Sequence, residues 1–200
     1  MSKINLASKK PKVSITNKIA FGIGMLANQM FPAALGVFII VLVQDLGFAA
    51  LLWGIIQLAP RIFDSITDPI MGFISDNTKS KWGRRRQYVF VGGLIMGIAY
   101  IAMWQLYDEN GITYNFIYFL TWSLVFYIGL TIFSVPYVAM GYEMSEDFHE
   151  RTQIMAIAQF IGQWAWVIAP WFWVILYDPT WFPDGAGQGV RELSIWVAIS

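Results

Sequence analysis

The chain has 200 residues, of which 57% are hydrophobic and 13% are charged, and its formal net charge is zero. A soluble domain carries about 25% charged residues, so this composition excludes an ordinary soluble protein and indicates an all-α polytopic membrane protein. The absence of cysteine from the sequence excludes disulfides and thiol chemistry.

Five apolar segments long enough to cross a bilayer follow one another, and a sixth begins near the end of the chain. Residues 1–17 are polar and predict a cytoplasmic tail. The predicted helices, which each clear the ~20 residues needed to cross the hydrocarbon core, cover about residues 18–43, 49–75, 88–107, 113–142 and 153–177. The sixth segment starts near Leu193, after a loop at 178–189. We expect residues 18–200 to form an N-terminal transmembrane bundle, truncated in its sixth helix and lacking a C-terminal half.

Lysine, arginine and tryptophan predict how this bundle is oriented. Eleven basic residues lie in the tail up to Lys18 and in the loops after the second and fourth helices, whereas Arg191 alone lies in the opposite loops. By the positive-inside rule the N-terminus is cytoplasmic, and the plasma (inner) membrane is the expected location. The aromatic belt at the outer interface is expected to include Trp104, Trp171, Trp173 and Trp181.

The second helix carries three ionisable residues at membrane depth. Arg61, Asp64 and Asp68 are three and four residues apart, so they share one helical face, which Gln57 extends. Each costs roughly 2.5–3.5 kcal/mol in the bilayer, so such residues face a protein interior or a wet cavity. One guanidinium against two carboxylates leaves a deficit of one positive charge, which predicts a coupling ion, sodium or proton, at Asp64 and Asp68. The alternative is a static ion-pair cluster.

Polar side chains also recur at helical spacing in three other helices. They are Asn28 and Gln29 in the first, Tyr127, Thr131 and Ser134 in the fourth, and Gln159, Gln163 and Trp166 in the fifth. We expect these stripes to line a hydrophilic cavity at the midplane, where transporters bind substrate and ion, with Trp166 stacking on a sugar. The alternative is interhelical hydrogen bonding that holds a bundle together.

Other chemistry is absent from the sequence. It has no nucleophile–base pair, phosphate-binding loop or nucleic-acid module, so we expect neither an enzyme nor a cofactor. His149, the single histidine, lies in a predicted charged loop and cannot form a zinc site without cysteines. Gly92, Gly93 and Gly97 predict close packing of the third helix on a neighbour.

Two long runs resemble one transporter family. RIFDSITDPIMGFISD at residues 61–76, followed by KSKWGRRR at 79–86, and SVPYVAMGYEMSEDFHERTQ at 134–153 resemble the glycoside–pentoside–hexuronide:cation symporters. These form the melibiose-carrier branch of the major facilitator superfamily. The resemblance implies a major facilitator fold of twelve helices in two halves, of which this chain would be the N-terminal six-helix half. It also implies a carrier that imports sugars with Na⁺, Li⁺ or H⁺.

The resemblance implies roles for individual residues. Asp64 and Asp68 match the carboxylates of the family's cation site, and Thr131 matches a hydroxyl of that site. Thr67 stands where the sodium-coupled melibiose carriers have asparagine, so sodium and proton both stay open. The structural and gate residues are Arg61 together with the cytoplasmic gate motif of Asp76, Gly83, Arg84 and Arg85.

Where those carriers grip the sugar with two acidic residues and an arginine, this chain has Gln29, Ser134 and Gln159. The resemblance implies a sugar or glycoside as the small-molecule substrate. Because these three residues differ, it does not imply a galactoside. The predicted function is cation-coupled symport by alternating access. A lipid or lysolipid carrier on the same fold and a non-transporting membrane subunit are the alternatives, and nucleic acid is not expected as a partner.

Overall fold

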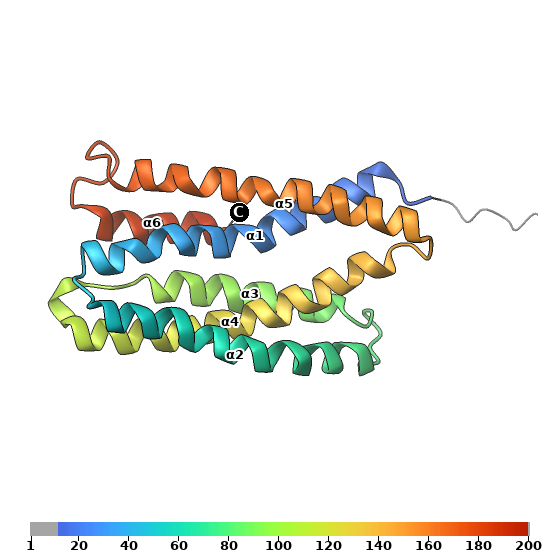
Figure 1. Ribbon diagram of the computed structural model, residues 1–200, viewed down its shortest axis with the longest axis horizontal. Coiled ribbons are helices and arrows are strands. Elements are labelled where there is room, and N and C mark those ends of the chain that lie inside the picture. Colours follow the sequence, from blue (N-terminus) through green and yellow to red (C-terminus); the bar gives the residue numbers. More distant parts are fainter. Residues whose placement is uncertain (1–11, 200) are drawn as a thin grey trace, which may run out of the picture.

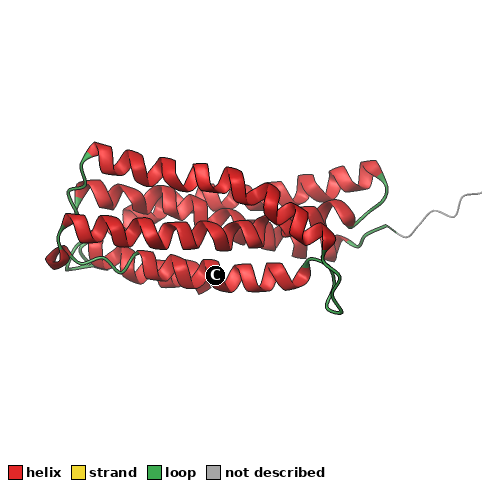
Figure 2. Ribbon diagram, turned by 90° about the horizontal axis from the view of Figure 1, so that it is seen from below, coloured by secondary structure: helices red, strands yellow, loops and turns green. Residues whose placement is uncertain are grey.

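The computed structural model describes residues 12–199, and this part of the chain is a bundle of α-helices with no strand. The helices are α1 (Ile15–Gln44), α2 (Ala50–Asn77), α3 (Arg86–Met103), α4 (Ile112–Glu143), α5 (Phe148–Leu176) and α6 (Ala186–Ile199), with a short 3-10 helix, η1 (Asp108–Asn110), before α4. They lie side by side along the long axis of the molecule (Figures 1 and 2). The predicted all-helical fold class is confirmed.

Several predicted boundaries are wrong, and for α5 the described structure gives the reason. α5 begins at Phe148, five residues before the predicted start, because the Asp147 side chain accepts a hydrogen bond of 2.8 Å from the Glu150 backbone N–H and caps the helix. His149 therefore lies in the first turn of a helix rather than in a loop. α3 ends at Met103, and α6 begins at Ala186, inside the predicted 178–189 loop. Of the predicted tail, residues 1–11 lie outside the described part.

Within residues 12–199, four helices are long and apolar enough to cross a membrane: α1, α3, α4 and α5. α2 has 28 residues and is therefore long enough, but Arg61, Asp64 and Asp68 make it more polar than these four. α6 has 14 residues. Five helices of the described chain are thus long enough to cross a membrane, and α2 differs from the other four in carrying charged residues near its middle.

The helices form two groups that meet along a seam. α1 packs mainly against α5, whereas α2 and α3 pack mainly against α4, and α6 contacts α1 and α3. Figure 1 shows α1, α5 and α6 on one side and α2, α3 and α4 on the other. We call these the α1–α5 group and the α4 group. The loops after α2 and α4 lie at one end of the bundle, the α2–α3 loop end, and those after α1, α3 and α5 lie at the other, the α1–α2 loop end (Figure 1).

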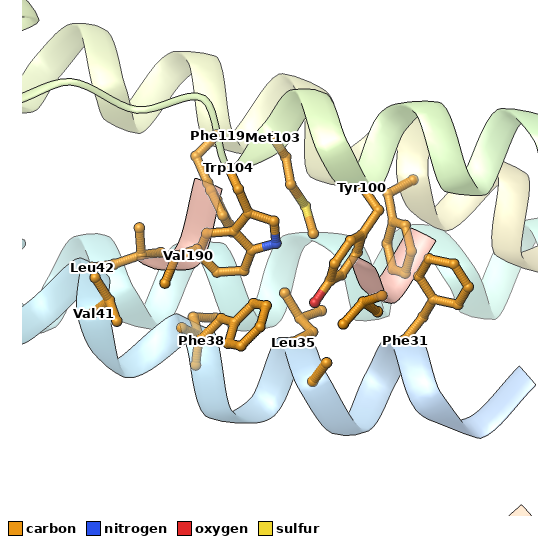
Figure 3. Close-up of a cluster of buried hydrophobic side chains, with 14 of the residues drawn as sticks. Phe31, Leu35, Phe38, Val41, Leu42, Tyr100, Met103, Trp104, Phe119 and Val190 are labelled. Atoms are coloured by element: carbon orange, nitrogen blue, oxygen red, sulfur yellow. The ribbon is translucent and has the colours of Figure 1, made fainter. Parts of the chain in front are cut away.

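A cluster of aromatic side chains joins the two groups toward the α1–α2 loop end (Figure 3). Trp104 is 2% exposed, and its ring centroid lies 5.5 Å from that of Phe38 in α1 and 5.1 Å from that of Phe119 in α4. Trp104, which directly follows α3, is therefore covered by α1 and α4 instead of facing lipid as a residue of the predicted belt would. Trp171 and Trp181 are exposed, in keeping with an outer belt.

α3 and α4 cross in direct backbone contact. A Cβ atom on Gly92 would lie 2.5 Å from the backbone nitrogen of Phe133, and one on Gly129 would lie 2.6 Å from that of Met96. The predicted close packing is therefore confirmed at Gly92. At Gly93 the nearest atom would be 3.6 Å away, which is ordinary contact.

Candidate functional site

A cluster of two carboxylates and two hydroxyls lies between α2 and α4. The Thr131 hydroxyl oxygen lies 2.8 Å from Oδ1 of Asp64 and 3.0 Å from Oδ1 of Asp68, and the Thr67 hydroxyl is 3.3 Å from it. The Thr131 hydroxyl has one hydrogen, so it donates to one carboxylate at a time. The other carboxylate oxygen then faces the hydroxyl oxygen with no hydrogen between them. Such an arrangement favours a proton or a cation at this point.

Local helical geometry brings these groups together. Asp64 and Asp68 are four residues apart in α2 and Thr67 lies between them, so all three reach the side of α2 that faces α4. On α4, Thr131 is 3% exposed and lies two residues from Gly129, which contacts the backbone of α3. The close crossing of α3 and α4 therefore fixes the depth and rotation at which Thr131 meets α2.

The cluster opens into a cavity of about 190 Å³ at the seam between the two helix groups. The cavity is lined by Asn28, Gln29 and Pro32 of α1, Asp64 and Asp68 of α2, and Leu130, Thr131, Ser134 and Val135 of α4. Small-molecule pockets typically have about 300–1,000 Å³. These residues alone therefore enclose room for an ion and its waters rather than for a whole sugar.

The predicted substrate residues divide into two sets. Asn28, Gln29 and Ser134 line this cavity, and Trp166 joins them because its indole N–H donates to Gln29 Oε1 over 3.3 Å. The remaining three, Tyr127, Gln159 and Gln163, are not among the residues that line it.

Tyr127 is buried against Phe126, one turn from Thr131, with ring centroids 5.4 Å apart. Gln163 is exposed, and Gln159 lines a separate groove near the α2–α3 loop end. Gln159 and Trp166 are seven residues apart and share a face of α5, so they differ in depth: Gln159 lies about two turns nearer the α2–α3 loop end than Trp166.

Arg61 does not neutralise the carboxylates. Its residue is exposed, and no ion pair joins it to Asp64 or Asp68 within residues 12–199. The expected meeting of one guanidinium with both carboxylates is therefore wrong for the described structure. The two carboxylates consequently share a cavity without a basic partner, which strengthens the electrostatic case for an added positive charge.

The predicted gate residues form an ion-pair network at the α2–α3 loop end. Arg85, which is 8% exposed, hydrogen-bonds Asp76 at the end of α2, and its Nη1 lies 3.3 Å from Glu143 Oε1 at the end of α4. Arg84 hydrogen-bonds the same Glu143 oxygen. Gly83 has φ +98°, a left-handed conformation that glycine adopts without strain, so the loop can turn back onto α4. The network links α2 to α4 outside the cavity.

Sequence reasoning missed three charged residues at this end. Glu143 completes the gate network, and its signal was its position directly after the fourth apolar segment. Lys18 Nζ lies 3.5 Å from Glu150 Oε1, and Glu150 also accepts hydrogen bonds from the Val13 backbone N–H and the Ser145 hydroxyl. These contacts tie the start of α1 to the α4–α5 loop. Their signal was the charged run around Glu150.

The chain resembles known transport proteins over most of its length. Residues 20–180 match the family described as MFS/sugar transport protein. An uncharacterized symporter of Synechocystis is 26% identical over 94% of this chain and 35% of the relative. Sodium-dependent lysophosphatidylcholine symporter 1 of Xenopus tropicalis is 30% identical over 72% of the chain and 28% of the relative, and a lactose permease of Lactobacillus helveticus is 25% identical over 78% and 26%. The chain spans about a quarter to a third of the length of these curated relatives.

Proposed function

Because the chain belongs to the MFS/sugar transport protein family, we propose that it forms the cation-binding bundle of a symporter that couples uptake of a sugar or glycoside to sodium or proton entry. Symporters among its relatives, together with the membrane-length helices, support an integral membrane protein. The family resemblance drawn from the sequence motifs is confirmed. The substrate, the ion and the plasma-membrane location with a cytoplasmic N-terminus are parts of the proposal.

The observation that carries the proposal is the convergence of Asp64 and Asp68 on the Thr131 hydroxyl at the wall of a seam cavity. Two carboxylates without a basic partner at membrane depth acquire a cation, and its charge compensates theirs. Gln29 and Ser134 line the same cavity and supply neutral hydrogen-bonding groups for hydroxyls of a substrate. The ion thus binds beside groups that can contact one part of the substrate, and the rest of a sugar would extend out of this cavity.

Coupling follows from this proximity. When a cation neutralises the carboxylates, the cavity becomes less costly to cover with a neutral polar substrate, so each ligand favours binding of the other. Such a reciprocal coupling free energy is typically about 1–3 kcal/mol. The gate network of Arg85, Asp76 and Glu143 would hold the cytoplasmic side closed while the site faces outward, and its opening would release both ligands inward.

Uptake by the full-length protein in proteoliposomes tests the proposal. Labelled mono- and disaccharides are offered under an imposed sodium gradient or an imposed proton gradient, and wild type is compared with Asp64→Asn. The matched control is Asp108→Asn, which removes an exposed carboxylate in η1, far from the cavity. We expect gradient-driven accumulation of a sugar by wild type and by Asp108→Asn, and its loss in Asp64→Asn.

Two results would contradict the proposal. Accumulation that persists unchanged in Asp64→Asn would mean that the carboxylate cluster does not couple transport. Failure of every sugar to accumulate under either gradient would remove the sugar part of the proposal. A non-transporting membrane subunit would show no uptake of any kind, and Asp64→Asn would leave its own function almost unchanged.

A lysolipid carrier is the second candidate function, and two observations favour it. The Xenopus tropicalis relative is named a lysophosphatidylcholine symporter. The groove that includes Gln159 has a volume of about 470 Å³ and is lined by the apolar surfaces of Tyr142, Phe148 and Met155, which suit an acyl chain. The same vesicles should be offered labelled lysophosphatidylcholine, and sodium-driven uptake of this lipid without uptake of any sugar would select this candidate.

A further inference from the structure

We propose that the Asn28 side-chain oxygen is a direct ligand of the coupling cation and that this cation is sodium rather than a proton. The inference rests on the proposed function and deepens it, because it adds a ligand from α1 to the pair of carboxylates on α2 and the hydroxyl on α4. The cation then binds across the seam, in contact with both helix groups.

The first observation is an unpaired oxygen in a buried side chain. Asn28 is 8% exposed, and its Nδ2 donates a weak hydrogen bond to Met25 Sδ at 3.7 Å. Its Oδ1 is fully buried and accepts no hydrogen bond from any residue in the described part of the chain. A buried amide oxygen without a partner carries an unfavourable desolvation free energy of about 1–3 kcal/mol, so a ligand that contacts it is stabilising.

The second observation is where the Asn28 residue lies. Asn28 lines the same cavity as Asp64, Asp68 and Thr131. Among the described residues that line the cavity there is no lysine, arginine or histidine, and neither of the neutral donors Gln29 and Ser134 hydrogen-bonds Oδ1. The amide therefore adds a neutral oxygen to the two carboxylates and the hydroxyl.

The chemistry of these four oxygens distinguishes a metal cation from a proton. A proton on one carboxylate forms a single O–H···O bond, which can relieve either the crowded Thr131 contact or the unpaired Asn28 oxygen but not both. A sodium ion contacts several oxygens at once, and carbonyl oxygens replace its hydration shell in protein sites. One sodium ion could therefore satisfy the carboxylates of Asp64 and Asp68 and the amide oxygen of Asn28 together.

Ligands from both helix groups would connect ion binding to the substrate side of the cavity. α1 packs mainly against α5, whereas α2 packs mainly against α4, so a cation held by Asn28 and the carboxylates links two groups that otherwise meet through side chains. Gln29 follows Asn28 in α1 and accepts the hydrogen bond from Trp166 of α5. Binding of sodium would therefore restrain the α1 segment that carries this amide.

Sodium affinity of the purified full-length protein tests the inference without any transport measurement. The melting temperature is followed against sodium concentration at constant ionic strength, with potassium as the replacing ion, and the apparent Kd is obtained from the increase. Wild type is compared with Asn28→Ala, with Asn28→Asp, which keeps an oxygen, and with Asn115→Ala. Asn115 is the matched control because it is also buried, 2% exposed, with an unpaired Oδ1, but it lies near the α1–α2 loop end, where it bonds the Tyr107 carbonyl.

We expect Asn28→Ala to weaken sodium binding by about tenfold or more, as loss of one well-placed interaction does, while Asn28→Asp and Asn115→Ala retain it. If Asn28→Ala does not give folded protein, Asn28→Leu, which restores the side-chain volume without an oxygen, takes its place. Sodium affinity equal to wild type in the oxygen-free variant, together with its loss in Asp64→Asn, would overturn the role of Asn28 and leave the carboxylate site standing. No sodium effect on wild type, with uptake driven by a proton gradient, would overturn the choice of ion but not symport.

Discussion

Gly92→Ala is the substitution whose effect on the site can be worked out most directly from the structure. The added Cβ would lie 2.5 Å from the backbone nitrogen of Phe133 and 2.8 Å from the backbone carbon of Ile132. Backbone atoms within a helix cannot rotate aside as a flexible side chain can. To restore a contact of 3.4 Å, α3 and α4 must separate by about 0.9 Å at this crossing.

The displaced segment of α4 is the one that carries Thr131. Overpacking of this kind costs typically about 1–3 kcal/mol of stability. Thr131 immediately precedes Ile132, and its hydroxyl meets Asp64 at 2.8 Å and Asp68 at 3.0 Å. Distances between the oxygens of O–H···O hydrogen bonds span only about 0.5 Å, so a helix shift of about 0.9 Å would break at least one of these contacts. We therefore expect Gly92→Ala to lower both the melting temperature and the cation affinity, although the residue contacts neither carboxylate.

Gly93→Ala is the matched control, because it makes the same chemical change one residue along α3. Its Cβ would lie 3.6 Å from Cδ2 of the Phe133 side chain, an ordinary contact. The assay is thermal unfolding of the purified full-length protein in detergent, with and without sodium. We expect Gly92→Ala to melt several degrees below wild type and Gly93→Ala to match it. Equal melting temperatures for the two variants would refute the reasoning that α4 cannot yield at this crossing.

Two further predictions concern contacts that reach α1. Tyr137→Phe removes a buried hydroxyl that donates to the Phe21 carbonyl but keeps the ring stack between these residues, so the protein should lose about 1 kcal/mol of stability; an unchanged melting temperature would contradict this. Trp166→Phe removes the N–H donor to Gln29 and keeps an aromatic ring, so it should weaken substrate binding several-fold at unchanged sodium affinity. Direct binding of radiolabelled substrate measures this against the exposed Trp164→Phe, and equal affinities would exclude a role for the donor.

Local sequence patterns predicted much of the fold and the acidic part of the site. Helix number and type follow from runs of apolar residues. The shared face of Asp64 and Asp68 follows from a spacing of four residues within one helix. Thr131 came from the resemblance, and the structure brings it into contact with both carboxylates. In each case the information lies within one helix or one motif.

Features that depend on where one helix lies against another could not be predicted in this way. The polar stripe on α5 correctly grouped Gln159, Gln163 and Trp166, yet only Trp166 reaches the residues of the cavity. Hydropathy placed Trp104 at the interface because it lies at the end of an apolar run, but α1 and α4 cover it. The early start of α5 did have a local signal, because an aspartate three residues before a glutamate is typical of a helix N-terminus.

The position of the acidic residues within α2 has a physical explanation in how the seam is filled along its length. Toward the α2–α3 loop end, α1 and α4 meet through the stacked rings of Phe21 and Tyr137. Toward the α1–α2 loop end, the Phe38 and Trp104 rings join the groups. Asn28 lies between Phe21 and Phe38 on α1, at the depth where the seam holds a polar cavity instead of aromatic rings. Hydrophobic contacts thus hold the groups together on both sides of the carboxylates, so charge compensation in the cavity can change without separating the bundle.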